Sequence, residues 1–175
     1  MQTLPEIEIR LFTMNDLRTL RALRLEALKN DPQAFGSNYE REAGRTDEEW
    51  IERYKKTEGG NPSSVFVMAM HGGWAVGMAG AYHREDGHWD VVAVYVTPEF
   101  RGQGISRKVI ERVIQDVNAT GNAKPIEVTV NVNQKAAVGL YQTLGFEIVE
   151  TLKDQRLGGG KTYDEYRMQR KLAKT

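Results

Sequence analysis

The chain has 175 residues, in which 24 Lys and Arg balance 24 Asp and Glu, and it contains no cysteine. A formal net charge of zero gives no overall field to attract nucleic acid or an anionic membrane. The lack of cysteine excludes a disulfide scaffold, a thiolate metal site and a cysteine nucleophile. No apolar run has the length of a signal-peptide core or a membrane span, so we expect a soluble, cytoplasmic protein. We expect one domain over 1–175, because this length suits a single core that buries about two thirds of the unfolded surface.

The first half of the chain predicts a strand, two helices and three further strands. Apolar residues recur at helical spacing after the first strand, and a capping box of Thr46 and Glu49 opens the second helix. The segment between these helices, 34–44 (AFGSNYEREAG), has the composition of a loop. Three apolar segments separated by glycine-containing turns then predict an antiparallel meander. The predicted ranges are strand 7–12, helices 17–28 and 46–54, and strands 64–70, 74–83 and 88–98.

The second half alternates between helix and strand, which together with the meander indicates the α/β (α+β) class. Gly145 is expected to end the second of these helices as a C-cap, and the loop 158–160 separates the last two strands. No repeat or linker divides the chain. The predicted ranges are helix 105–117, strand 126–132, helix 137–144, and strands 146–152 and 162–172.

The turn at 101–106 (RGQGIS) joins an apolar strand directly to a helix. A helix start has unpaired amide N–H groups at the positive end of the helix dipole, and glycine lets the backbone approach a ligand closely. Arg101, Arg107 and Lys108 add positive charge. The pattern predicts a phosphate site, with pyrophosphate as the natural ligand, although a plain strand-to-helix turn stays open as an alternative. A dinucleotide fingerprint would need glycine at position 107, and no P-loop Gly-Lys-Ser/Thr is present.

Two segments resemble motifs of the GCN5-related N-acetyltransferases. The first is 101–106, which is similar to the family's Arg/Gln-x-x-Gly-x-Gly/Ala turn, with Ser106 in the last position. The second is 131–146 (NVNQKAAVGLYQTLGF), which is similar to the family's Asn-x-x-Ala-x-x-Leu-Tyr-x-x-x-Gly-Phe segment. Asn133 lies one residue before the position of the family asparagine, which Gln134 occupies, so Asn133, Gln134 or neither binds the pantetheine arm. The resemblance extends in element order from about residue 7 to 172.

The resemblance implies an acetyl-CoA-dependent N-acetyltransferase with acetyl-CoA as cosubstrate. The implied fold is a mixed, twisted, mainly antiparallel sheet of about seven strands flanked by about four helices and splayed between strands 4 and 5. Acetyl-CoA would lie in this opening, with its pantetheine paired to one strand and its pyrophosphate on the amides of the turn. The implied cofactor-binding residues are Val94, Val96, Arg101, Gly102, Gln103, Gly104, Ile105, Ser106, Arg107 and Asn133.

Acetyl transfer to an amine needs a neutral amine, a polarised thioester carbonyl and a proton for the departing thiolate. Direct transfer in a ternary complex meets these needs without a covalent enzyme intermediate. The resemblance implies that Tyr141 protonates the CoA sulfur, since a phenol and a thiol have comparable basicity. The alternative for Tyr141 is ordinary packing beside Leu140 and Leu144.

The base is predicted near the start of the fourth strand, where the family often has a glutamate. Asp90 is the nearest equivalent here, and His88 lies two residues away on the same face, with an imidazole of the kind that commonly takes up protons near neutral pH. Either would act directly or through water. The alternative is that both are solvated residues beside the 85–87 turn. The three histidines show no metal-ligand spacing, so we expect no metal site.

The family selects its acceptor with segments that correspond to 32–58 and 154–165. The first is rich in acidic and aromatic residues, which suits a cationic small-molecule or peptide amine, but interleaved basic residues favour a solvated helix face instead. Two other functions stay open, a non-catalytic acyl-CoA-binding module and a nucleotide-binding or interaction domain. Dimers are common in the resembled family, so a homodimer is the oligomer that the resemblance suggests.

Overall fold

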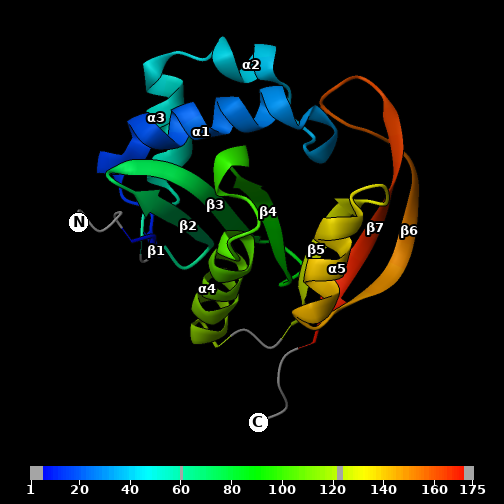
Figure 1. Cartoon of the computed structure of the whole chain (residues 1–175). Coiled ribbons are helices and arrows are strands. Elements are labelled where there is room, and N and C mark those ends of the chain that lie inside the picture. Colours follow the sequence, from blue (N-terminus) through cyan, green and yellow to red (C-terminus); the bar gives the residue numbers. More distant parts are fainter. Residues whose placement is uncertain (1–5, 60, 122–123, 172–175) are drawn as a thin grey trace.

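The computed structural model describes residues 6–59, 61–121 and 124–171 and contains a seven-stranded sheet in the order β1-β2-β3-β4-β5-β7-β6 (Figure 1). Neighbouring strands are antiparallel except β4 and β5, which are parallel. This mixed, mainly antiparallel sheet confirms the expected fold class. The strands are β1 (Glu8–Leu11), β2 (Ser64–His71), β3 (Trp74–His83), β4 (Trp89–Val96), β5 (Ile126–Asn131), β6 (Phe146–Arg156) and β7 (Thr162–Arg170).

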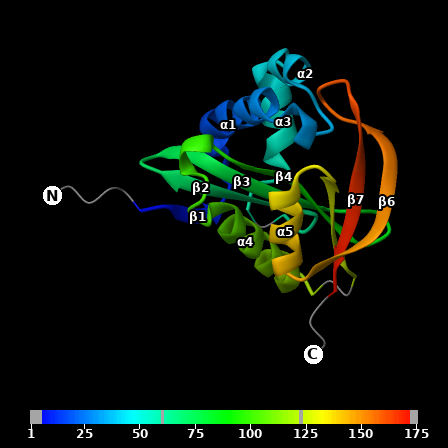
Figure 2. The ribbon, with the colours of Figure 1, turned by 45° about the vertical axis from the view of Figure 1, so that its right-hand side comes forward.

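Helices cover both faces of the sheet (Figure 2). One face carries α1 (Leu17–Asn30), α2 (Tyr39–Ala43) and α3 (Asp47–Lys55), and the other carries α4 (Ile105–Ala119) and α5 (Lys135–Thr143). Strand β2 is buried on both faces because its alternate residues enter different cores. Val65, Val67 and Ala69 pack with α4 and α5, whereas Phe66, Met68 and Met70 pack with α1 and α3.

The opening between β4 and β5 was predicted and is confirmed. Their parallel pairing covers only Trp89 to Val91 on β4 and Ile126 to Val128 on β5. Two residues later Ala93 has a φ of 57°, which an L-residue rarely adopts, and the register between β3 and β4 shifts nearby. The bulge turns β4 away from β5, so the two strands diverge towards their carboxyl ends.

The segment 34–44, predicted as a loop, contains the helix α2, so that prediction is wrong in part. The described residues therefore hold five α-helices, one more than expected, together with short 3-10 helices at Met14–Asp16, Pro32–Ala34 and Pro98–Phe100. Asn38 caps α2 by accepting a hydrogen bond from the Arg41 amide at 2.9 Å. A helix of five residues shows no apolar periodicity, and only such a cap marks it in the sequence.

The other predicted elements are present with small changes in their ends. Gly145 follows α5 with a φ of 88°, as expected of a glycine that ends a helix. Strand β6 continues to Arg156 through an irregularity at Asp154, whose φ is 52°. The predicted end of the last strand, residue 172, lies outside the described residues.

Candidate active site

Two cavities meet where β4 and β5 diverge. The turn cavity, of about 820 Å³, is lined by β4, the 101–107 turn and α5. The arginine cavity, of about 650 Å³, is lined by Arg24, Arg53, Arg84 and Arg156 together with β4, β5 and β7. The residues that line both cavities are Ala34, Phe35, Val94, Gln134, Ala137 and Tyr141. Molecules in the two cavities could therefore both contact these six residues.

The 101–107 turn has two glycines with positive φ and leads directly into α4. Gly102 and Gly104 have φ values of 75° and 76°, and Gly104 is the N-cap of α4. A Cβ added to either glycine would meet no atom within 4 Å, so it would point into open space. Ile105 and Ser106, which begin α4, line the same cavity. The free amides of the helix start therefore face the turn cavity.

The two arginines of this turn, Arg101 and Arg107, form hydrogen bonds and ion pairs with other residues of the protein. Arg101 donates from Nε to the Val96 carbonyl at 2.9 Å and pairs with Asp31 at 2.8 Å. Arg107 pairs with Glu111 at 3.0 Å and donates to Thr143 Oγ1 at 2.7 Å, which ties α4 to α5. Both also line the turn cavity. Gln103 lines neither cavity.

Strand β4 presents an open backbone edge to the cavities. Pairing with β5 ends at Val91, so Val94 and Val96 have no strand partner on that side among the residues described. Val96 lines the turn cavity and Val94 lines both. Asn133 and Gln134 lie across the opening in the lining of the turn cavity. The edge is therefore free to accept an extended ligand as an added strand would be accepted.

Tyr141 lies where the two cavities meet. Its side chain lines both cavities, its ring packs edge-on against Phe146 at 5.6 Å between centroids, and the residue is buried. Within the described parts of the chain its hydroxyl has no hydrogen-bond partner. Burial raises the pKa of Tyr141, so the phenol is protonated at neutral pH and free to donate.

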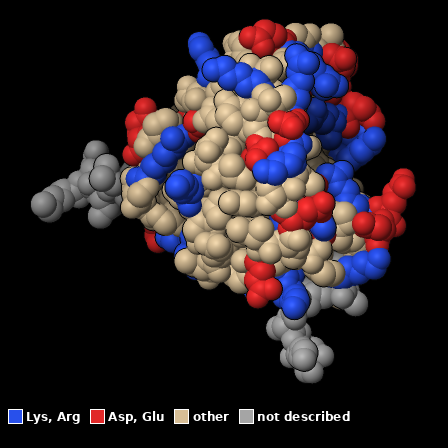
Figure 3. Space-filling model, turned by 90° about the vertical axis from the view of Figure 1, so that its right-hand side faces the viewer, with Lys and Arg blue, Asp and Glu red and all other residues tan. Residues whose placement is uncertain are grey.

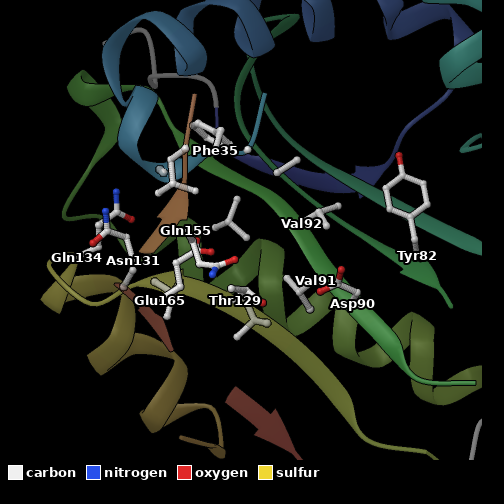
Figure 4. A pocket seen from close by; sticks show the side chains of 18 of the residues that line it. Phe35, Tyr82, Asp90, Val91, Val92, Thr129, Asn131, Gln134, Gln155 and Glu165 are labelled. Atoms are coloured by element: carbon white, nitrogen blue, oxygen red, sulfur yellow. The ribbon is translucent and has the colours of Figure 1, made fainter. Parts of the chain in front are cut away.

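The two predicted bases have different surroundings. Asp90 lines the arginine cavity (Figure 4), where its carboxylate lies 2.5 Å from the Arg84 guanidinium. His88 lines neither cavity, and its ring lies 2.5 Å from Asp86 and 3.4 Å from Glu127. The structure thus brings Asp90, but not His88, to a cavity shared with Tyr141.

Glu165 was missed by sequence reasoning. It lies on β7 opposite Asn131 of β5 and lines the arginine cavity (Figure 4). Its carboxyl group has no hydrogen bond or ion pair in the described structure, and desolvation raises the pKa of Glu165. Its position depends on strand pairing between residues far apart in the chain, so no local pattern could have indicated it.

The acidic residues of 32–58 do not form a wall of either cavity. Glu42 is buried in ion pairs with Arg45 and Arg53, and Glu52 pairs with Lys55. The aromatic residues Phe35 and Tyr54 do line the arginine cavity. On the face of the molecule formed by β6 and β7, acidic and basic side chains are interspersed around uncharged surface (Figure 3).

The β6–β7 loop closes over the Phe35 side of the cavities. The Gly158 amide donates to the Phe35 carbonyl at 2.7 Å, and a Cβ at Gly158 would lie 2.0 Å from the Ser37 carbonyl oxygen. This contact joins the two segments, 32–58 and 154–165, that were expected to select the acceptor. Both segments contribute residues to the arginine cavity.

The sequence was compared with models of known protein families. The family model described as "Acetyltransferase (GNAT) family" matches residues 24–146, more than half of the chain. The chain belongs to this family. In this GNAT chain the match includes the 101–107 turn, both strands of the opening and Tyr141.

The relatives of this GNAT chain agree on the fold. A curated relative, "N-alpha-acetyltransferase daf-31" from Caenorhabditis elegans, is 32% identical over 118 residues, or 65% of this chain and 63% of the relative. The chain thus spans slightly less than two thirds of that protein. A GNAT acetyltransferase from Streptococcus pneumoniae has a TM-score of 0.80 at 24% identity, over 95% of this chain and 100% of the other. Spermidine N-acetyltransferase from Vibrio cholerae, solved with CoA and spermine, has a TM-score of 0.73 at 20% identity, over 93% and 94% of the two chains.

Two other expectations concern absences. Across 6–59, 61–121 and 124–171, no helix combines the length and apolar character needed to cross a membrane. Within the same ranges, no group of three or more His, Asp or Glu side chains is arranged to hold a metal ion.

Proposed function

We propose that this chain is an acetyl-CoA-dependent N-acetyltransferase that moves the acetyl group directly to a primary amine in a ternary complex. The observation that carries the proposal is the Tyr141 side chain, which lines both cavities at their junction. The turn cavity would hold acetyl-CoA and the arginine cavity the amine. Their shared lining would hold donor and acceptor next to each other and so supply the proximity that direct transfer needs.

The turn cavity would bind acetyl-CoA mainly through backbone groups. Amides from Gly102 to Arg107 would take the pyrophosphate, and the missing Cβ of Gly104 leaves the space that the phosphates need. The backbone of Val94 and Val96 would pair with the pantetheine along the open edge of β4. The amide side chain of Asn133 or Gln134, in the turn that precedes α5, would complete this contact.

Tyr141 would act as the general acid. When the amine nitrogen attacks the thioester carbon, the C–S bond breaks and the thiolate takes the phenolic proton. Because burial raises the pKa of Tyr141, its proton is retained until this charge develops.

The base that takes the proton of the amine would be a carboxylate of the arginine cavity. Asp90 and Glu165 both line it. We favour Glu165, because Asp90 is already paired with Arg84, whereas Glu165 has no such partner among the described residues and its pKa is raised by desolvation. A base with a pKa nearer the working pH is more effective. His88 would contribute only through water, since its ring lies outside both cavities.

The test is release of CoA thiol with acetyl-CoA and a panel of amines. The chain has no cysteine, so all thiol that is detected comes from CoA. We expect thiol release to depend on an amine, with intersecting initial-velocity lines and an acetylated amine as product. Parallel lines with an acetylated protein would contradict direct transfer. Tight CoA binding without turnover of any amine would instead indicate the non-catalytic acyl-CoA-binding module.

A further inference from the structure

Arg24 is a buried cation that lines the arginine cavity and forms no ion pair with any described residue. It lies within α1, only 6% of its surface is exposed, and it lines the cavity. Its Nε is buried with no hydrogen-bond partner in the described structure. Its guanidinium lies over the Phe35 ring at 5.1 Å. Burying an unpaired charge is costly, and the desolvation lowers the pKa of Arg24.

The nearby carboxylate does not neutralise this cation. Glu42 accepts from Arg45 at 3.0 Å and from Arg53 at 3.1 Å, and Ser37 donates to it at 2.7 Å. Its side chain is 1% exposed, so these contacts leave it little access to Arg24. The guanidinium groups of Arg45 and Arg53 therefore share the Glu42 carboxylate. The charge of Arg24 has no ion-pair partner among the described residues.

Hydroxyl donors accompany Arg24 in the same wall. The hydroxyl groups of Tyr54 and Tyr82 have no hydrogen-bond partner among the described residues, and both side chains line the arginine cavity. Burial raises the pKa of both phenols, so they are protonated donors at neutral pH. Arg24, Tyr54 and Tyr82 come from α1, α3 and β3. Together they form a wall of unpaired donors suited to an oxyanion.

Glu165, a carboxylate of the cavity that is unpaired among the described residues, lies away from these donors. Glu165 is on β7, and the sheet order places β4 and β5 between β3 and β7. Figure 4 accordingly shows Tyr82 and Glu165 on different sides of the pocket. The cavity thus has an anion-binding wall and a separate carboxylate for an amine.

We propose that the acceptor is a small amine that also carries a carboxylate, such as a free amino acid, and that Arg24 binds this carboxylate while Glu165 faces the amine. The inference rests on the proposed function, since it assigns the acceptor to the arginine cavity. A polyamine fits poorly, because it would bring further positive charge beside Arg24.

The test measures binding, so that it does not depend on turnover. The chain is saturated with CoA and titrated calorimetrically with the common amino acids, each matched with its decarboxylated amine and its α-carboxamide, and with spermidine. We expect at least one amino acid to bind about 10- to 100-fold more tightly than its two matched analogues. This is the change in dissociation constant expected when a hydrogen bond to a charged group is lost. The inference is overturned if the analogues or spermidine bind as tightly as the acids, or if no amino acid binds.

Variants identify the residue responsible. Arg24→Met should abolish the preference for the acid, whereas Arg18→Met, the same change at an exposed position of α1, should keep it. Removing an unpaired buried charge should leave the unfolding midpoint of Arg24→Met unchanged or raised. Arg24→Lys, which keeps the charge without the planar fork, should keep part of the preference and provides a second test of the position. Full preference in Arg24→Met would overturn the assignment.

Turnover separates this inference from the proposed function. If amines without a carboxylate are acetylated as well as amino acids, the function stands and this inference fails. If amino acids bind with the expected preference but none is acetylated, the inference about the cavity stands and the proposed function fails.

Discussion

The properties of Tyr141 come from its place at the end of a short helix. The α5 backbone directs the side chain to the junction of the two cavities, and Phe146 packs against its ring. The rest of the ring is buried, but the hydroxyl faces space that a ligand would fill. Motif resemblance identified this residue, whereas helical spacing alone could not distinguish it from a packed tyrosine.

Replacing Tyr141 with Phe should therefore lower kcat by about 10²- to 10⁴-fold, the range for general acid–base catalysis. The dissociation constant of acetyl-CoA should change little, because in the proposed mechanism the phenol would act on the sulfur only as the C–S bond breaks. Steady-state kinetics and titration calorimetry measure the two quantities. Tyr163→Phe, on β7 and outside both cavities, is the matched control. An unchanged kcat in Tyr141→Phe would remove this residue as the acid.

The environment of Glu165 predicts how the stability of the fold depends on pH. Its pKa is raised in the folded state, so the folded chain keeps this proton to higher pH than the unfolded chain. Ionisation of Glu165 therefore destabilises the fold at pH values above its raised pKa. Well below the ordinary pKa of about 4.3, Glu165 is protonated in both the folded and the unfolded chain and has no effect on the free energy of unfolding. Glu165→Gln should raise the unfolding midpoint at pH 7 but not near pH 4, whereas exposed Glu147→Gln should change neither.

The same variant tests the base. If Glu165 takes the proton of the amine, the acid limb of the pH profile of kcat/KM should disappear in Glu165→Gln and persist in Asp90→Asn. The opposite result would assign the base to Asp90.

At the scale of elements, the β6–β7 loop and the segment before α2 form one closed contact. Gly158 fits against the Ser37 carbonyl because it has no Cβ, and the neighbouring Gly159 has no atom nearer than 3.6 Å to an added Cβ. An added methyl group would therefore clash at Gly158 but not at the adjacent Gly159.

Gly158→Ala should force the two segments apart. Overpacking of this kind costs about 1–3 kcal/mol, and each kcal/mol lowers the unfolding midpoint by about 2–4 °C at this size. The KM for the amine should rise as well, since both segments line the arginine cavity. Gly159→Ala is the control, and equal midpoints and KM values for the two variants would contradict the closure.

Local patterns predicted most elements because each strand and long helix has its own periodicity. The splay between β4 and β5 followed from the family resemblance, but the bulge at Ala93 did not, since alanine gives no signal for a φ of 57°. Arg24 escaped notice because it stands among the leucines of an amphipathic helix. Its missing counterion, like the position of Glu165, depends on contacts between distant segments, which a single sequence does not reveal.

At the scale of the whole molecule, two separate cores hold the sheet from opposite faces. The cavities meet through the gap that this sheet leaves between β4 and β5. A formal net charge of zero supplies no overall electrostatic attraction for an anionic ligand. In this account, binding therefore depends on local groups, namely the amides of the turn and the hydrogen-bond donors of the arginine cavity. The central claim is therefore that acetyl-CoA binds in the turn cavity.

A thermal unfolding scan with acetyl-CoA, CoA, ATP or NAD in separate samples tests this claim most directly. Ligand at a hundredfold its dissociation constant adds about 2.7 kcal/mol, which raises the midpoint by about 5–10 °C at this size. We predict this shift for the two CoA species alone. It should be lost in Gly104→Val but kept in Gly121→Val, another glycine with positive φ that faces open space and lies outside both cavities. No shift with saturating acetyl-CoA, or equal shifts with ATP and NAD, would contradict the account.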